Sequence, residues 1–312
     1  MKHLVTGGAG FIGSHVAHEL SRESDAETVV LDNLSVGRKE NVPSRCRLIV
    51  GDINDPSALS EALDGVDVLL HQAAFVSIRG SFTKLDDDLR ANCEGTLAVL
   101  RAAGEHGVKR VVFASSMAVY GQPAQLPVRE DAPALPTSPY GLSKLRGEMY
   151  GRILAREFGF SFIALRYFNT YGTGQTPSDY VGVITSFINM ALDGRPMTIH
   201  GDGEQTRDFV WVGDIARANA LAARADVEGV YNIGSGNEIS INAIAQMIRR
   251  CVGGKVTRVD APPGEIRRMS ADISRAKDAL GYEPQGHLEA ILPEIADDWR
   301  RKRAAPRQEQ DA

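Results

Sequence analysis

Tyr140 and Lys144 stand four residues apart in the stretch SPYGLSKLRGEMY, residues 138–150. Ser138 is placed as an N-cap and Pro139 in the first turn, so a helix is predicted to begin here. Residues four apart share one helical face, which puts a phenol beside an ammonium. A nearby positive charge lowers a tyrosine pKa from its usual value of about 10. Tyr140 is thus a candidate general acid–base; the alternative is a surface tyrosine and a solvated lysine.

A glycine-rich turn opens the chain in HLVTGGAGFIGSHVAHEL, residues 3–20. Gly7, Gly10 and Gly13 lie between a strand-like run and a helical pattern, where backbone amides can approach a pyrophosphate. Asp32 ends the next strand-like run and is spaced to bind a ribose 2′-hydroxyl. Its carboxylate favours NAD over NADP, whereas Arg38 nearby would favour NADP. The alternative is a plain glycine turn.

Asp52 and Ile53 follow the third apolar run in GDIND, residues 51–55. They could frame an adenine, one by a hydrogen bond and one by contact. The alternative is an ordinary loop, in which Asn54 or Asp55 caps the following helix. The residues alone favour neither.

Short apolar runs alternate with helical patterns up to about residue 170, which predicts a doubly wound parallel α/β sheet of the Rossmann type. Residues 1–170 are expected to form a dinucleotide-binding domain, with a returning segment near 208–234. Residues 171–300 are expected to form a smaller, interleaved α/β substrate region. Residues 301–312 are polar without an apolar period and are expected to be a flexible tail.

The composition limits the classes of partner that are expected. The 312-residue chain has a formal net charge of −5, which does not indicate affinity for nucleic acid. Its three scattered cysteines lack metal spacing and are typical of reduced, cytoplasmic thiols. No apolar run is long enough to span a membrane, and no leader precedes the first strand-like run. A soluble cytoplasmic protein without a metal or a membrane partner is therefore expected.

The motifs together resemble the extended short-chain dehydrogenase/reductases of the NAD-dependent epimerase/dehydratase family, most closely those that act as UDP-hexose 4-epimerases. The resemblance covers roughly residues 1–300. It is carried by TGGAGFIGSH, LDNLSVGRKENV, GDI, HQAA, ASSMAVYG, SPYGLSKL, LRYFNTYG, GDGEQTRDFVWVGD and GEIRRMSADISRAKDALGY.

The resemblance implies NAD as cofactor, a UDP-sugar as substrate and a role for each matching residue. The implied catalytic residues are Ser116, Tyr140 and Lys144. The implied cofactor contacts are Gly7, Gly10, Phe11, Ile12, Gly13, Asp32, Asn33, Ser35, Gly37, Asp52, Ile53, Ala73, Ala74, Asn92, Ser115, Tyr140, Lys144, Tyr167 and Phe168. The implied substrate contacts are Ser77, Arg79, Ser116, Met117, Tyr140, Asn169, Val183, Arg207, Arg267 and Met269. Arg207 and Arg267 would hold the pyrophosphate, where a planar bidentate donor suits.

Fold alone does not decide the reaction. Related dehydratases resemble TDE after the serine, whereas this chain has Met117 and Ala118, which cannot move protons. Met117, Ala118 and Asn169 also differ from the pattern of enzymes acting on glucuronate. C4 epimerisation of a neutral or N-acetylated UDP-hexose is therefore expected. The alternative is another oxidoreductase, reductase or dehydratase of nucleotide sugars. Related enzymes pair two long helices, here within residues 89–107 and 138–159, in a four-helix bundle, so a homodimer is expected.

Overall fold

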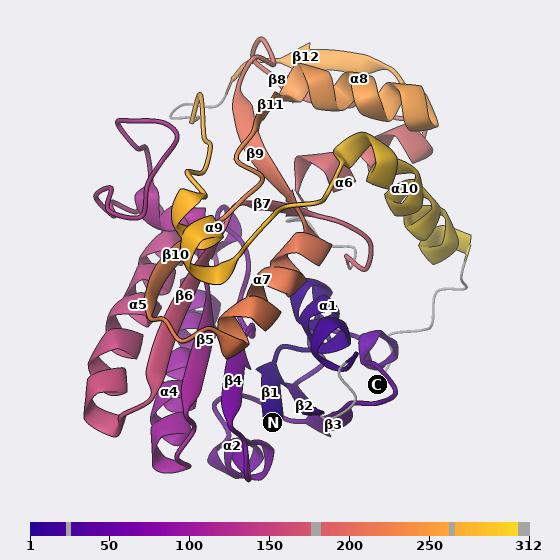
Figure 1. Ribbon diagram of the computed structural model, residues 1–312. Helices are drawn as coiled ribbons and strands as arrows, with labels where there is room; N and C mark the ends of the chain where they lie inside the picture. The colour runs from indigo at the N-terminus through magenta and orange to yellow at the C-terminus, as the bar shows by residue number, and fades with distance from the viewer. Residues whose placement is uncertain (23–25, 176–181, 262–265, 305–312) are drawn as a thin grey trace.

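The computed structural model describes residues 1–22, 26–175, 182–261 and 266–304. Within these residues a seven-stranded parallel sheet has the order β10-β6-β5-β4-β1-β2-β3 (Figure 1). Its strands are β1 (Lys2–Thr6), β2 (Glu27–Asp32), β3 (Arg47–Val50), β4 (Val68–His71), β5 (Arg110–Ser116), β6 (Ser161–Tyr167) and β10 (Gly229–Ile233). The predicted doubly wound sheet is confirmed, and the buried, apolar composition of its strands is what a sheet covered on both faces requires.

Helices cover both faces of this sheet. On one face lie α1 (Phe11–Leu20) and α7 (Val212–Arg224), which pack against each other. On the other face lie α2 (Pro56–Leu63), α4 (Thr96–Glu105) and α5 (Pro139–Phe158). Two separate apolar clusters, one beneath each layer, fill the space between helices and sheet.

A smaller region lies beyond the carboxyl ends of the strands, at the top of Figure 1. It contains the sheets β11-β9-β7 and β12-β8 and a third apolar cluster. Its elements are β7 (Asn169–Tyr171), α6 (Val183–Leu192), β8 (Met197–His200), β9 (Thr206–Trp211), β11 (Glu238–Ser240), α8 (Ile241–Val252), β12 (Val256–Val259) and α10 (Leu288–Ala304). The helix α9 (Ser274–Leu280) instead packs against β10 and α7 of the seven-stranded unit.

Two boundaries differ from the sequence prediction. Residues 301–304 continue α10 rather than opening a tail, because the Lys302 ammonium bonds Asp298 Oδ2 at 2.7 Å and the Gln175 carbonyl at 2.6 Å. Residues 305–312 lie outside the described part of the chain. The helix predicted over 89–107 begins as a π-helical segment, η3 (Leu89–Gly95), which follows α3 (Leu85–Asp88). Shorter helical turns are η1 (Lys39–Asn41), η2 (Gly80–Phe82) and η4 (Met117–Tyr120).

The start of α5 is as predicted. Ser138 is its N-cap, and Ser138 Oγ accepts a hydrogen bond from the Gly141 amide at 3.1 Å. Pro139 occupies the first turn, and Gly159 ends the helix in the left-handed conformation. The helix therefore holds Tyr140 and Lys144 on a rigid support beside the end of β5.

Candidate active site

The glycine turn joins β1 to α1 with little room to spare. Gly7 has φ +69°, and a Cβ there would lie 2.7 Å from the Ala73 backbone. A Cβ at Gly13 would lie 2.1 Å from the Gly7 carbonyl oxygen. The N-cap of α1 is Gly10, which offers no side-chain bond to the first amides of the helix, those of Phe11 and Ile12. These amides can therefore receive an anion, and the turn fits a pyrophosphate.

Asp32 connects this turn to the loop after β2. The side chain is 8% exposed, and its oxygens accept from the Ala9 amide at 2.9 Å and the Leu34 amide at 2.8 Å. A carboxylate has about four acceptor positions, so it can also receive ribose hydroxyls. Gly37 closes the same loop, because a Cβ there would lie 2.8 Å from the Ala9 backbone. The donors and the space at this site fit a dinucleotide.

Asn33, Ser35 and Asp52 form a polar cluster beside this loop. Asn33 Oδ1 accepts from Ser35 Oγ at 2.7 Å, and Asn33 Nδ2 donates to Asp52 Oδ2 at 3.0 Å. Ile53 is 8% exposed and touches the position of Gly95. Asp55 caps α2, since its Oδ1 accepts from the Ser57 amide at 2.9 Å. Of the two caps considered, Asn54 and Asp55, the structure uses Asp55.

A wall opposite the glycine turn is formed by Ala73, Ala74 and Phe75. Asn92 is 2% exposed and bonds both backbone polar groups of Phe75, its amide and its carbonyl. Its Oδ1 accepts from the Phe75 amide and its Nδ2 donates to the Phe75 carbonyl, each at 2.9 Å. Asn92 therefore supports this wall through the Phe75 backbone.

Ser116, Tyr140 and Lys144 come together where β5 ends and α5 begins. Ser116 bonds the Tyr140 side chain, and Ser116 Oγ also accepts from the Ala118 amide at 3.2 Å. The Lys144 ammonium lies 5.8 Å from the centre of the Tyr140 ring and donates to the Ala114 carbonyl at 2.9 Å. Tyr140 is 7% exposed and Lys144 is 3% exposed. A hydroxyl, a phenol and an ammonium therefore converge in a site that excludes most water.

The acid–base state of this pair differs from the sequence expectation. Burial raises the pKa of Tyr140 to about 12, although the Ser116 hydrogen bond acts in the opposite direction. Burial also lowers the pKa of Lys144 to about 8. The expected lowering of the tyrosine pKa by Lys144 and bound NAD⁺ is not seen in the ligand-free protein, because burial disfavours the phenolate.

Ser115 bonds α5 one turn beyond Lys144. Its Oγ donates to Glu148 Oε1 at 2.5 Å, and Arg166 donates to the two oxygens of Glu148 at 2.8 and 2.7 Å. The Arg166 guanidinium also lies 4.6 Å from the centre of the Tyr120 ring. The Ser115 side chain, predicted as a cofactor contact, is therefore used to fix α5 against β5 and β6.

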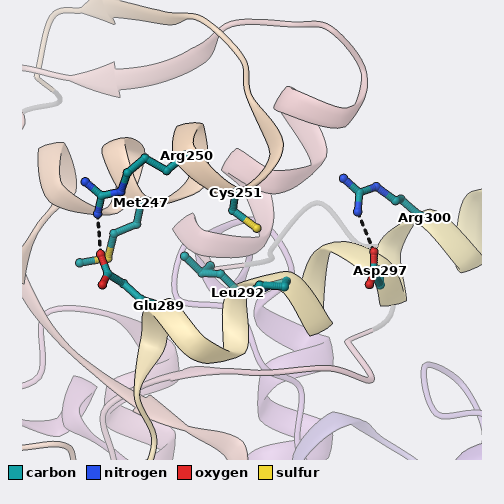
Figure 2. Close-up of a pocket in the computed structure, with 8 residues that line it drawn as sticks. Met247, Arg250, Cys251, Glu289, Leu292, Asp297 and Arg300 are labelled. Carbon is teal, nitrogen blue, oxygen red and sulfur yellow. Dashed lines mark hydrogen bonds and ion pairs between the residues drawn. The ribbon is translucent and has the colours of Figure 1, made fainter.

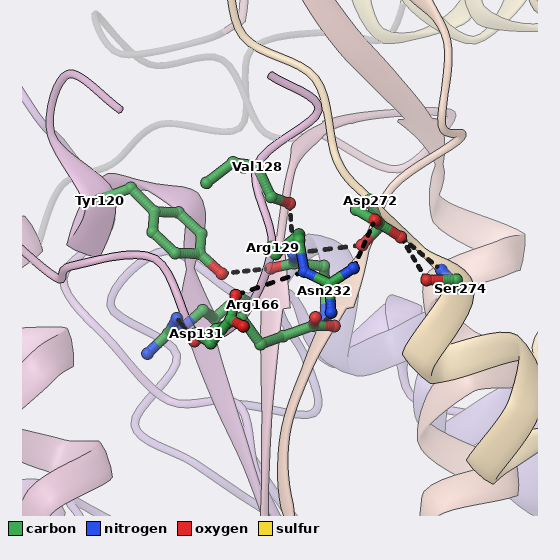
Figure 3. Close-up of polar contacts among 9 residues, drawn as sticks. Tyr120, Val128, Arg129, Asp131, Arg166, Asn232, Asp272 and Ser274 are labelled. Atoms are coloured by element: carbon green, nitrogen blue, oxygen red, sulfur yellow. Dashed lines mark hydrogen bonds and ion pairs between the residues drawn. The ribbon is translucent and has the colours of Figure 1, made fainter. Parts of the chain in front are cut away.

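Figure 3 shows how this packing reaches the C-terminal region. Tyr120 Oη donates to Asn232 Oδ1 at 2.6 Å. Asn232 Nδ2 in turn donates to the carbonyls of Val128 at 2.9 Å and Asp272 at 3.2 Å. Glu148, Arg166 and Asn232 were not anticipated from the sequence, since isolated charged or amide residues in apolar runs carry no local signal of their partners.

Tyr167, Phe168 and Asn169 pass between the two regions. The Tyr167 hydroxyl bonds Asn219 and Gln72, and Phe168 is 3% exposed in the apolar cluster beneath α7. Asn169 Oδ1 is buried and has no hydrogen-bond partner in the described structure. An orphaned buried acceptor is costly in a folded protein, so Asn169 is a candidate for ligand contact.

Arg207 and Arg267 lie on neighbouring segments, because the Thr206 amide donates to the Arg267 carbonyl at 3.0 Å. Arg207 Nη1 donates to the Thr206 carbonyl at 2.7 Å. The exposed Arg267 makes a bidentate pair with Asp202, at 2.7 and 2.6 Å. This pair holds the pKa of Asp202 at about 2. The two arginines are thus placed together on the C-terminal region.

The other predicted substrate contacts differ in exposure. Met269 is 1% exposed and belongs to the cluster that also contains Tyr167 and Phe168, with Met117 packed against it. Ser77 is buried, and its Oγ accepts from the Gly80 amide at 2.7 Å. Val183 begins α6 and is half-buried, while Arg79 is exposed.

A separate hollow lies between α8 and α10, away from this site (Figure 2). Its charged side chains pair with each other: Arg250 with Glu289 at 2.5 Å, and Arg300 with Asp297 at 2.6 Å. It contains none of the predicted site residues.

No helix among the described residues is long and apolar enough to cross a membrane. No group of three or more His, Cys, Asp or Glu side chains in the described ranges is arranged to hold a metal ion.

Comparison with known proteins agrees with this geometry. The model of the NAD dependent epimerase/dehydratase family matches residues 3–234. The chain belongs to this family. The UDP-glucose 4-epimerase of Azospirillum brasilense is 36% identical over 308 residues, covering 90% of this chain and 87% of that protein.

Solved structures are similar over nearly the whole chain. One is a UDP-N-acetylglucosamine 4-epimerase from Methanobrevibacter ruminantium in complex with UDP-N-acetylmuramic acid, with 35% identity, a TM-score of 0.91 and coverage of 96% of this chain and 98% of that one. Another is the Thermus thermophilus UDP-glucose 4-epimerase in complex with NAD, with 34% identity, a TM-score of 0.89 and coverage of 96% and 99%. NAD is accordingly the cofactor of this family member.

Proposed function

We propose that the protein interconverts the C4 epimers of a UDP-hexose, using NAD and passing through a transient 4-keto sugar. The observation that carries this proposal is the convergence of Ser116, Tyr140 and Lys144 beside a dinucleotide-binding turn. The relatives reported above are named as 4-epimerases of UDP-glucose and UDP-N-acetylglucosamine. UDP-Glc/UDP-Gal and UDP-GlcNAc/UDP-GalNAc are therefore the proposed substrate pairs.

Each residue of the triad has a defined task in this reaction. Ser116 hydrogen-bonds the sugar 4-oxygen and holds it beside Tyr140. Tyr140 takes the proton of the 4-hydroxyl and later returns it to the opposite epimer. Lys144, anchored to the Ala114 carbonyl, supplies a fixed positive charge that favours the phenolate. When bound, NAD⁺ provides the hydride acceptor and further positive charge.

The two regions would bind different ligands. We place the dinucleotide on residues 1–170 with the returning segment near 208–234, and the nucleotide sugar mainly on residues 171–300. Asn169, with its unpartnered buried oxygen, is assigned to the substrate phosphates. Arg207 and Arg267 are assigned to the pyrophosphate, which would replace Asp202 as the bidentate partner of Arg267.

A direct test is incubation of the purified protein with UDP-Glc, UDP-GlcNAc, UDP-GlcA and their C4 epimers. The expected result is inversion at C4, detected by NMR, with no net conversion between NAD and NADH. Net formation or consumption of NADH in proportion to substrate would instead favour an oxidoreductase or reductase on the same scaffold. Loss of water from the sugar would favour a dehydratase.

We also propose a cytoplasmic homodimer joined through α4 and α5. Exposed apolar side chains gather on these helices and on the segment before them; they are Leu85, Leu89, Leu97, Leu142, Met149 and Ile153. Leu142, Met149 and Ile153 follow helical spacing along one face of α5. Exposed apolar side chains on one helix face fit a second copy across a two-fold axis. Light scattering showing only monomer at micromolar concentration would exclude the dimer.

A further inference from the structure

Asp88 ends α3 as a buried carboxylate pressed against α5. It is 2% exposed, whereas its neighbours Asp86 and Asp87 on the same short helix are exposed. A carboxylate is costly to bury unless hydrogen bonds or an opposite charge stabilise it. Its surroundings therefore indicate what the site gains from it.

Two contacts connect Asp88 to both halves of the site. Asn92 Nδ2 donates to Asp88 Oδ1 at 2.7 Å, and the same Asn92 amide group clasps the backbone of Phe75 in the cofactor wall. Ser143 Oγ lies 3.4 Å from the same oxygen and also donates to the Tyr140 carbonyl at 2.9 Å. One carboxylate oxygen thus joins the cofactor wall to the first turn of the helix that carries Tyr140 and Lys144.

The charge of Asp88 acts on the same helix. Burial lowers the pKa of Lys144, and Asp88 is the largest of the influences that raise it. Burial raises the pKa of Asp88, while the bonds from Asn92 and Ser143 and the charge of Lys144 oppose that rise. Asp88 also raises the pKa of Tyr140 electrostatically.

The other titratable groups around the pair come from β4, η3 and β6. His71 on β4 has its pKa lowered to about 3 by burial and is neutral at pH 7. Cys93 on η3 has its thiol pKa raised by burial, and burial also raises the pKa of Tyr167 on β6. Glu148, further along α5, is paired with Arg166. Among the described groups that act on Lys144, Asp88 therefore supplies the negative charge.

We propose that Asp88 is a positioning residue for the epimerisation: through Asn92 its carboxylate fixes the cofactor wall at Phe75, through Ser143 it braces the first turn of α5, and its negative charge acts on Lys144 of the same helix. This inference rests on the proposed function. Removing one negative charge lowers the proton affinity of every titrating neighbour. Both the Lys144 and the Tyr140 titrations then move to lower pH.

The test is the pH profile of kcat/KM for Asp88→Asn. The new amide oxygen can still accept from Asn92 and Ser143, so the variant removes the charge and keeps the shape. Both limbs of the profile should move to lower pH by about one unit. Asp87→Asn, exposed on the same helix, is the matched control and should leave the profile in place. Ser143→Ala removes a bond to Asp88 but no charge, so its limbs should not move. Unshifted limbs in Asp88→Asn would overturn the charge role of Asp88, whatever the rate.

A second measurement does not depend on turnover. The titration of Lys144 can be followed in the ligand-free protein by NMR of carbon-13-labelled lysine, with the signal assigned by its loss in Lys144→Arg. Its apparent pKa, about 8 in the unmodified protein, should fall in Asp88→Asn and stay in place in Asp87→Asn. In the unmodified protein the same signal should show a small second inflection as Asp88 gains its proton at acid pH. This measurement uses only the unmodified protein, so it does not depend on whether a variant folds.

The two measurements separate the two proposals. If the unmodified protein inverts no sugar, the proposed function fails, and the lysine titration still tests the role of Asp88. If the protein is an active epimerase but the Lys144 titration is the same in Asp88→Asn, the role of Asp88 is wrong and the function stands.

Discussion

The buried pair of Glu148 and Arg166 should be among the most sensitive points for the stability of the fold. The two side chains are 1% and 4% exposed and meet at 2.7 Å. Glu148→Gln removes the charge and turns a new N–H₂ donor toward a guanidinium that is itself a donor. Removing one partner of a buried ion pair costs about 3–5 kcal/mol, because the other charge is left uncompensated.

The structure places the expected loss at the low end of that range. Arg166 keeps the Tyr120 ring at 4.6 Å and the Glu130 carbonyl at 3.3 Å, and Ser115 can still bond the amide oxygen. We therefore expect Glu148→Gln to lower the free energy of unfolding by about 3 kcal/mol. Urea unfolding followed by circular dichroism measures this. Glu157→Gln, exposed on the same helix, is the control and should change the free energy by less than about 0.5 kcal/mol.

A double-mutant cycle separates pairing from packing. Glu148→Met and Arg166→Met should each be strongly destabilising, whereas the two together should be far less so than their sum, since no charge is left unpaired. Two results would refute the reasoning. One is a loss of under about 1 kcal/mol in Glu148→Gln; the other is additive losses in the double variant.

Four further outcomes are expected. Tyr140→Phe should keep NAD binding but lower the epimerisation rate by about a hundredfold or more; near-normal turnover would exclude the mechanism. Asp32→Ala should weaken NAD binding and relax rejection of NADP, measured by calorimetry; tighter binding of NADP than NAD by the unmodified protein would contradict the role of Asp32. Met269→Tyr should selectively depress kcat/KM for the N-acetylated substrates, and an unchanged ratio would remove Met269 from the pocket. Burial lowers the pKa of His3 from 6.5 to about 4. The protein should therefore lose stability as the pH falls from about 6.5 to about 4, because the unfolded state binds the proton first. In His3→Leu the urea midpoint should depend less on pH over that range, and an unchanged pH dependence would argue against His3.

Local signals explain why much of the fold could be predicted from the sequence. The parallel strands appear as short, nearly continuous apolar runs, and the start of α5 is specified by Ser138 and Pro139 within one turn. The glycine turn and Asp32 depend on spacing along the chain, which the sequence shows directly. Tyr140 and Lys144 depend on helical periodicity. Each of these features is determined by residues close to one another in sequence.

Long-range side-chain contacts explain what could not be predicted. Ser115 and Glu148 are 33 residues apart, and Tyr120 and Asn232 are 112 residues apart. Nothing in the neighbourhood of any of them identifies its partner. The same holds for Asp88, one of three consecutive aspartates of which only the last is turned inward. The sequence shows three similar carboxylates, and packing alone distinguishes the one that faces the site.

The ionisation state of Tyr140 is the clearest case in which residue types and their neighbours are insufficient. Pairing a phenol with an ammonium predicts a lowered pKa, yet burial raises the tyrosine pKa to about 12 and lowers that of Lys144 to about 8. At pH 7 the ligand-free protein therefore holds a neutral phenol beside a charged lysine. The phenolate needed for proton abstraction requires additional positive charge near the ring. Since a bound dinucleotide in its oxidised form brings such a charge, Tyr140 should become a competent base only in the loaded site, and the free protein should keep its acid–base group inactive.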